Sequence, residues 1–171
     1  LSLGHRRIGF ILGPEDYSGS WERLDGFKAA LAAEGVPLEE GLVVAGDYTF
    51  ESGLAQGRAL LGAAMLPTAI FASNDEMAAG VIQAAYELGL RVPDELSVVG
   101  FDDGALACRL SPPLTTIRQP TIELAARVTE ALIRKINGEE EETRIEMCTS
   151  LVIRDSAAAH TGAKVPPTDN I

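Results

Sequence analysis

The sequence predicts an α/β fold in which a parallel sheet carries helices on both faces, in the doubly wound manner. Short apolar runs alternate with longer amphipathic segments along most of the chain, which is typical of β-α-β units. Glycine and proline separate the two kinds of segment. The chain has 171 residues, of which 46% are hydrophobic. We therefore expect one globular domain with a substantial core.

The first half of the chain contains three predicted strands and two predicted helices. The strands are expected at 7–12, 42–45 and 68–72. The first helix follows Gly13-Pro14, and Gly35 is a natural stop for it. Its apolar positions recur every three or four residues: Trp21, Leu24, Phe27 and Leu31. The second helix is expected at 53–61.

The second half opens with a helix that starts at Ser73-Asn74-Asp75, where short polar side chains can cap the first turn. A strand at 96–101, a short helical turn at 104–110 and an extended segment at 114–117 follow. Pro120 suits the first turn of a further helix, and Asn137-Gly138 ends it. The alternation in 144–154 predicts an edge or returning strand. We expect 157–171 to be a disordered tail.

Composition and charge exclude several classes of function. The chain carries 25 acidic and 14 basic residues, a net charge of −11, so this segment should not bind nucleic acid itself. The two histidines lie near opposite ends of the chain, so we expect no metal site and no cofactor. Two distant cysteines favour a reducing, cytoplasmic setting. No apolar run is long enough for a membrane helix, and no signal peptide is visible.

In an open parallel sheet, ligands bind outside the carboxyl ends of the strands, so the loops after each strand are the candidate binding region. Arg23, Tyr48, Asn74 and Asp102 all fall in or just after these loops. A guanidinium and an amide donate hydrogen bonds, a carboxylate accepts them, and an aromatic ring covers the C–H face of a sugar. The set predicts a site for a polyhydroxylated ring.

Each residue alone also fits an ordinary structural role: Arg23 on a helix surface, Asn74 as a helix cap, Asp102 in a turn and Tyr48 in the core. The catalytic motifs that we searched for are absent, including phosphate-binding loops and the GxSxG and HExxH patterns. Without a nucleophile-base pair at this edge of the sheet, we expect a binding protein and no enzyme.

Several segments in order and spacing resemble the C-terminal lobe of LacI/GalR transcriptional regulators. They are GHRRIGFILGP, ERLDGFKAAL, GDYTFESG, PTAIFASNDEMAAG, LGLRVPDELSVVGFDD, LSPPLTTIRQP and LVIRDS. The resemblance covers residues 4–156. It implies a periplasmic-binding-protein-like fold of two lobes, with a sugar or nucleoside effector in the cleft between them. By position it implies effector contacts by Arg23, Asn74 and Asp102, a ring-stacking Tyr48, and Gln119 beside the cleft.

The resemblance further implies a homodimer and operator DNA binding by an N-terminal helix-turn-helix, which this sequence does not contain. Four residues are candidates for the dimer interface, and the core is the alternative place for each: Met77, Val81, Tyr86 and Leu110. In the family pattern, 119–138 crosses to the first lobe, which is also missing. We therefore expect this helix to dock differently, to swap with a neighbour, or to be poorly ordered.

Three rival functions share parts of this pattern. A periplasmic sugar-binding protein for transport would have the same crevice. An enzyme such as a transferase would need catalytic groups that the sequence does not offer. A structural dimerisation module would not need polar loops at the sheet edge.

Overall fold

The computed structural model describes residues 1–139 and 144–160. Within them a six-stranded sheet has the order β2-β1-β3-β4-β5-β6. Strands β1 to β5 are parallel, and β6 pairs antiparallel with β5. The strands are β1 (Ile8–Leu12), β2 (Val43–Ala45), β3 (Ala69–Ala72), β4 (Ser97–Asp102), β5 (Thr115–Arg118) and β6 (Ser150–Val152). The predicted α/β class is confirmed, with one antiparallel edge strand added.

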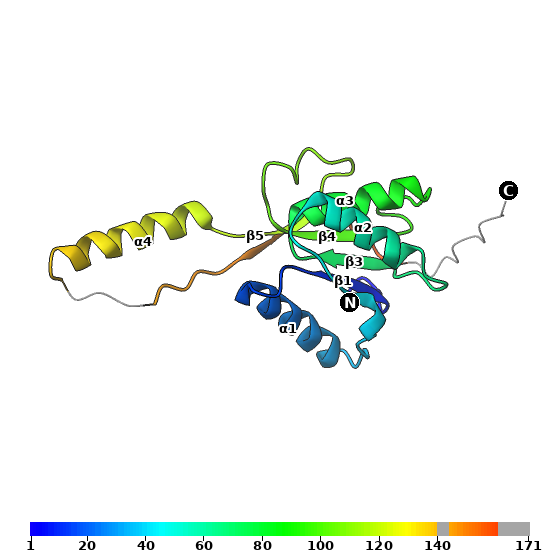
Figure 1. The fold of residues 1–171 in the computed structure, drawn as a ribbon, viewed down its shortest axis with the longest axis horizontal. Helices are drawn as coiled ribbons and strands as arrows, with labels where there is room; N and C mark the ends of the chain where they lie inside the picture. The colour runs from blue at the N-terminus through cyan, green and yellow to red at the C-terminus, as the bar shows by residue number, and fades with distance from the viewer. Residues whose placement is uncertain (140–143, 161–171) are drawn as a thin grey trace.

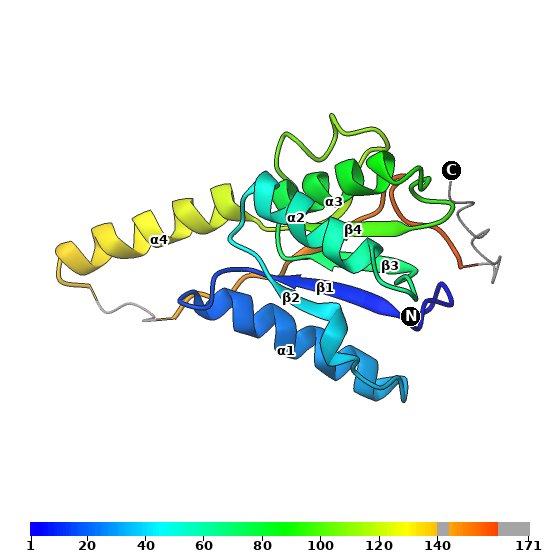
Figure 2. The same cartoon turned by 45° about the vertical axis from the view of Figure 1, so that its right-hand side comes forward.

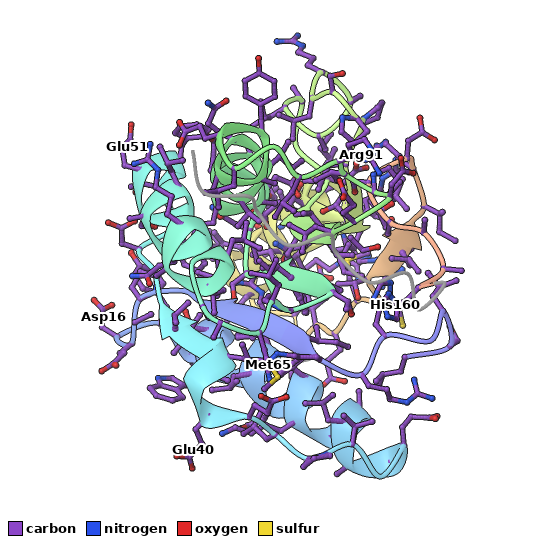
Figure 3. The ribbon with its side chains drawn as sticks, turned by 90° about the vertical axis from the view of Figure 1, so that its right-hand side faces the viewer. Asp16, Glu40, Glu51, Met65, Arg91 and His160 are labelled. Atoms are coloured by element: carbon purple, nitrogen blue, oxygen red, sulfur yellow. The ribbon has the colours of Figure 1, made fainter. Side chains whose placement is uncertain are left out.

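The helices lie on both sides of the sheet. Helix α1 (Ser18–Ala33) covers one side, and α2 (Phe50–Leu61) and α3 (Asp75–Glu87) cover the other, as Figures 2 and 3 show. A short 3₁₀ turn, η1 (Glu40–Leu42), precedes β2. Helix α4 (Thr121–Ile136) leaves the sheet beyond β5 and projects away from the rest of the molecule (Figure 1).

Two apolar clusters hold these layers together. The larger one fills the space between the sheet and the α2–α3 pair, and includes Ile11, Ile70, Met77, Val81 and Leu114. The smaller one lies under α1, where the rings of Phe10 and Phe27 stack with centroids 4.9 Å apart. Complete burial of one such aliphatic side chain is worth about 1.5–3 kcal/mol, so the larger cluster dominates the stability.

Helices α2 and α3 approach each other closely because glycines face each other across the contact. A Cβ on Gly80 would lie 2.3 Å from the carbonyl oxygen of Phe50, and one on Gly53 would lie 2.2 Å from that of Met77. Ordinary Cβ contacts are 3.4 Å or more. This contact fixes the N-terminal ends of both helices, and the candidate site residues Tyr48 and Asn74 lie just before these ends.

The ends of two segments differ from the expectation, and the short turn expected at 104–110 is present. Helix α2 begins at Phe50, earlier than 53, because the Thr49 hydroxyl accepts the backbone N–H of Ser52 at 3.1 Å. Within 144–154, only Ser150–Val152 forms a strand. The segment 104–110 is a run of turns held by bonds such as Leu110 N–H to the Leu106 carbonyl.

The start of the expected tail also differs, because 157–160 are held by specific hydrogen bonds. The Ala158 carbonyl accepts from His5 Nε2 at 2.9 Å, and the His160 N–H donates to the Leu3 carbonyl at 2.8 Å. Just before them, Ser156 is fully buried. Small residues allow this segment to lie close against the sheet. The rest of the expected tail, 161–171, lies outside the described residues.

Candidate functional site

A cavity of about 330 Å³ opens at the carboxyl edge of the sheet. Each of the strands β1 to β4 ends at this edge, and the segment that follows each one supplies part of the wall. The lining residues are Tyr17, Ser18, Gly19, Arg23, Tyr48, Asn74 and Asp102. The structure thus brings together four of the five predicted contacts. Tyr17, Ser18 and Gly19 were not among the predicted contacts, although they lie in the first of the loops that the sequence indicated.

Tyr48 connects the walls of this cavity. Its hydroxyl accepts from Arg23 Nη1 at 2.7 Å and shares a 2.8 Å hydrogen bond with Ser20 Oγ. Its backbone carbonyl accepts from Asn74 Nδ2 at 2.9 Å. The ring fits only because residue 13 is glycine, since a Cβ there would lie 2.2 Å from the Tyr48 ring. Tyr48 itself has a φ of 69°, a left-handed conformation that is uncommon for a non-glycine residue.

Arg23 lies between two aromatic rings. Its guanidinium carbon is 4.0 Å from the centroid of the Phe101 ring and 5.8 Å from that of Tyr48. A cation above the face of an aromatic ring is attracted by about 0.5–1 kcal/mol at exposed sites and by more when desolvated. These contacts hold the planar guanidinium at the cavity wall. Phe101 was not predicted as a site residue, because its contact with Arg23 joins residues far apart in the sequence and is visible only in the folded chain.

Asp102 is the acidic group of the cavity. Partial desolvation of its carboxyl raises the pKa, while a 2.6 Å hydrogen bond from Gln119 Nε2 and the positive charge of Arg23 act in the opposite direction. Its φ of 121° is a strained conformation for an L-residue, and such strain is often concentrated at functional sites. Gln119, the fifth predicted contact, does not line the cavity but orients the carboxylate that does.

Asp103, the residue after Asp102, links β4 to β5 and to the segment after β6. Asp103 accepts from Arg118 Nε at 2.6 Å and from Arg154 Nη2 at 2.5 Å, which ties β4 to β5 and to the segment after β6. Burial opposes ionisation of this carboxyl, but the hydrogen bonds and charges of the two arginines outweigh it and lower its pKa. Asp103 therefore holds the strained backbone at 102–103 in place.

Asn74 and Asp75 have separate roles at the start of α3. Asn74 Oδ1 accepts the N–H of Met77 at 2.9 Å, so this residue caps the helix, and it also lines the cavity. Asp75 is buried, and its carboxylate accepts from the N–H of Gly104 and the hydroxyl of Thr116. Burial raises the pKa of Asp75. Both alternatives for Asn74, cap and site residue, are compatible with this geometry.

Two of the four predicted dimer contacts are corrected by the structure. Met77 and Val81 have no exposed surface and belong to the core beneath α3, so they cannot touch a partner. Their side chains lie on the face of α3 that packs on α2 and the sheet. Tyr86 is 78% exposed, and Leu110 is partly buried against the same core.

The cavity can bind a ligand, but its lining residues offer little catalytic chemistry. They comprise a guanidinium, an amide, a carboxylate, hydroxyl groups and two tyrosine rings, and no histidine or cysteine is among them. In the described part of the chain, no group of three or more His, Cys, Asp or Glu side chains could hold a metal ion. Of the helices in 1–139 and 144–160, none is long and apolar enough to span a bilayer.

Comparison with known proteins decides the family. Residues 1–157 match the family model described as a periplasmic binding protein-like domain. The chain belongs to this family. The relatives and solved structures that it matches include transcriptional regulators of the LacI family. The ribose operon repressor of Escherichia coli strain K12 is 40% identical over 158 residues, which are 92% of this chain and 48% of the repressor.

Solved structures agree with this assignment. The CelR–cellobiose complex of a transcriptional regulator has a TM-score of 0.87 at 38% identity, covering 91% of this chain and 48% of that one. A dimeric Lac repressor with a C-terminal deletion has a TM-score of 0.88 at 32% identity, covering 93% and 58%. The LacI/GalR-type chain thus spans about half the length of the curated relatives that it matches.

Proposed function

We propose that this LacI/GalR-type domain is the effector-sensing lobe of a transcriptional regulator, and that the cavity at the sheet edge binds a sugar-like molecule. The observation that carries the proposal is the convergence of Arg23, Asn74 and Asp102 on one cavity with two tyrosine rings. Neighbouring hydroxyls on a ring match paired donors and acceptors of this kind. A relative of known structure is in complex with cellobiose, which supports the sugar class over the nucleoside class.

The proposed mechanism is a population shift. An effector that contacts both lobes of the intact regulator favours one relative orientation of the lobes, and this changes the affinity of a separate domain for operator DNA. Coupling requires that the effector contacts differ between the two orientations. The net charge of −11 agrees with DNA binding through another part of the protein. The regulator therefore acts in the cytoplasm, where its operator is.

The rival functions have less support. Curated relatives at 39% and 40% identity are transcriptional regulators, so a transport protein that shares the fold is not favoured. An enzyme of the nucleophilic kind would need a nucleophile activated by an adjacent base, and the lining residues of the cavity contain no histidine or cysteine to form such a pair.

A homodimer is part of the proposal, because the Lac repressor relative is a dimer. With Met77 and Val81 in the core, Tyr86 and Leu110 remain the candidate contacts on this side of the molecule. Tyr86 lies near the end of α3 and presents a large exposed ring, a residue type that is enriched in interfaces.

The test is a thermal-shift screen of the complete gene product against sugars and nucleosides. A ligand at 100 times its Kd should stabilise the protein by about 2.7 kcal/mol. Arg23→Ala and Asp102→Ala should each remove the shift. Arg91→Ala and Asp94→Ala are the matched controls, since both residues lie on the surface at 68% and 67% side-chain exposure. A shift that survives both cavity variants would place the site elsewhere.

A further inference from the structure

Tyr48 has a backbone conformation that its own side chain cannot support. Its φ of 69° lies in the left-handed region, where the Cβ of an L-residue comes too close to the following carbonyl oxygen. Asparagine and aspartate tolerate this region because their short polar side chains hydrogen-bond to the nearby backbone. A tyrosine side chain cannot do this, and the hydroxyl of Tyr48 is engaged by Arg23 and Ser20. The support for this conformation therefore comes from neighbouring residues.

The residues around Tyr48 supply a closed set of hydrogen bonds. Asp47 Oδ1 accepts from the backbone N–H of Thr49 at 2.9 Å and from its hydroxyl at 2.6 Å, so one carboxylate oxygen spans Tyr48. Thr49 Oγ1 accepts from the N–H of Ser52 at 3.1 Å, and the N–H of Asp47 donates to Ser52 Oγ at 3.2 Å. We call Asp47, Thr49 and Ser52 the Tyr48 clamp.

Two further hydrogen bonds attach this turn to the rest of the domain. The N–H of Gly46, just before the clamp, donates to the carbonyl of Leu12 in β1 at 2.8 Å. The carbonyl of Tyr48 accepts from Asn74 Nδ2 at the start of α3. The clamp also includes the first turn of α2. The conformation of Tyr48 is thus fixed relative to β1, α2 and α3.

The backbone of Tyr48 decides where its ring lies. The ring packs on Gly13 and meets the ring of Tyr17 edge-on, with centroids 6.1 Å apart. A change of φ from 69° to the ordinary helical value would turn the Cα–Cβ bond by roughly 130° relative to the preceding chain. The ring would then leave Gly13 and Arg23, and the cavity would lose an aromatic wall.

Asp47 is the central member of the clamp. It is exposed and does not line the cavity, so neither the core nor direct contact with an effector accounts for it. Hydrogen bonding by the side chains of Ser52 and Thr49, and by the N–H of Thr49, lowers the pKa of Asp47 to about 2. Asp47 is therefore ionised at neutral pH, and hydrogen bonds to an ionised acceptor are about twice as strong as those between neutral groups.

We propose that Asp47 is a positioning residue of the effector site, which keeps the Tyr48 ring at the cavity wall before an effector binds. This inference rests on the proposed function and deepens it, because a preorganised wall lowers the ordering cost of binding. The apparent Kd of a site rises in inverse proportion to the fraction of molecules that are competent to bind. If loss of the clamp leaves the ring in place in about one molecule in ten, the Kd rises about tenfold.

The first test locates the Tyr48 ring in the absence of any effector. The chain has three tyrosines, so labelling with 3-fluorotyrosine gives three ¹⁹F resonances, which Tyr17→Phe and Tyr86→Phe assign. Tyr86 is 78% exposed and supplies the reference for a ring in solvent. Asp47→Ala should move the Tyr48 resonance toward that of Tyr86. Asp47→Asn keeps an oxygen acceptor for Thr49 and should leave the resonance near its wild-type position.

Two further variants calibrate this measurement. Glu51→Ala is the matched control, because Glu51 is an exposed acid in the first turn of α2, outside the clamp (Figure 3). Loss of either acid removes one negative charge near the N-terminus of the helix, so a change caused by charge alone would appear in both variants. Glu51→Ala should leave the Tyr48 resonance unchanged. Gly13→Ala should displace the ring, because the new Cβ would lie 2.2 Å from it.

The second test measures the consequence for binding. The 171-residue chain is titrated with cellobiose and with ribose, followed by ¹⁵N chemical shifts. For a sugar that binds, Asp47→Ala should raise the Kd about tenfold, and Asp47→Asn and Glu51→Ala should keep it within about twofold of wild type.

The outcomes separate this proposal from the proposed function. A Tyr48 resonance that Asp47→Ala leaves unchanged would overturn the positioning role, because the hydroxyl bonds to Arg23 and Ser20 would then suffice to hold the ring. A Kd that Asp47→Ala leaves unchanged would overturn it as well. A chain whose Tyr48 resonance responds as expected but which binds neither sugar would count against the proposed function alone, and Asp47 would remain the residue that positions the ring.

Discussion

The glycine contact between α2 and α3 leads to the most specific prediction about stability. In Gly80→Ala, the new Cβ would lie 2.3 Å from one backbone atom and 2.4 Å from another, against an ordinary contact of 3.4 Å. The two helices would have to separate by about 1 Å. Overpacking of a rigid site costs about 1–3 kcal/mol, and the better helix propensity of alanine returns up to about 1 kcal/mol. Because every clashing atom is backbone, we expect a net destabilisation of about 2 kcal/mol.

The assay is thermal unfolding followed by circular dichroism. For a domain of this size, 1 kcal/mol corresponds to about 2–4 °C, so Gly80→Ala should lower the Tm by about 4–8 °C. Gly26→Ala in α1 is the matched control, because nothing lies within 4 Å of its Cβ. That variant should raise the Tm slightly, since alanine restricts the unfolded chain and favours the helix. Equal effects of the two substitutions would refute the argument that the close helix contact, and not loss of glycine as such, sets the cost.

Three further substitutions each change one hydrogen-bonding side chain. Asp103→Asn should destabilise the domain by about 2 kcal/mol at pH 7, because two arginines lose their charged partner. The pKa of Asp103 is lower in the folded state than in the unfolded state, so its contribution to stability is present above the unfolded pKa. In urea titrations, the difference from wild type should therefore vanish as the pH falls through the folded pKa. Tyr48→Phe removes the hydroxyl that accepts from Arg23, and should weaken effector binding in calorimetry while costing about 1 kcal/mol of stability. Ser156→Ala leaves the buried N–H of Thr115 without its acceptor and should cost about 1–3 kcal/mol in the same unfolding assay, with a cost below about 0.5 kcal/mol contradicting its role.

The sequence was sufficient to predict the edge of the sheet at which polar groups meet. Strands that alternate with amphipathic helices must be parallel, and parallel strands end at one edge, so Tyr48, Asn74 and Asp102 could be placed together without coordinates. Arg23 followed from its position in the first turns of the helix after β1. The hydrogen bond between Gln119 and Asp102 could not be foreseen, because it depends on the left-handed backbone at Asp102.

The orientation of α3 was harder to predict. This helix is apolar around much of its circumference, so the sequence pattern does not say which of its apolar residues face the core and which face solvent. Met77 and Val81 were therefore candidates both for an interface and for the core, and the structure buries both of them fully in the core. The close contact between α2 and α3 could not be predicted from Gly53 and Gly80 either, because a glycine within a helix usually indicates only a lower helix propensity.

Isolated hydrogen bonds explain why the tail was predicted to begin too early. The small and polar residues of 157–171 predicted disorder from composition, but Ala158 and His160 are held by hydrogen bonds to His5 and Leu3. Such single bonds leave no periodic signal in the sequence. By contrast, the amphipathic pattern of α4 could be predicted from the sequence, and the structure describes no buried residue in this helix.

The central claim is that the cavity lined by Arg23, Tyr48, Asn74 and Asp102 is the effector site, and chemical-shift mapping tests it most directly. The 171-residue chain, labelled with ¹⁵N, is titrated to high millimolar concentrations of cellobiose, ribose and adenosine, because half a cleft should bind only weakly. We predict that at least one of the two sugars shifts the amide resonances around the cavity, and that Asp102→Asn removes these shifts. Saturable shifts confined to another surface, or shifts that Asp102→Asn leaves unchanged, would contradict the assignment.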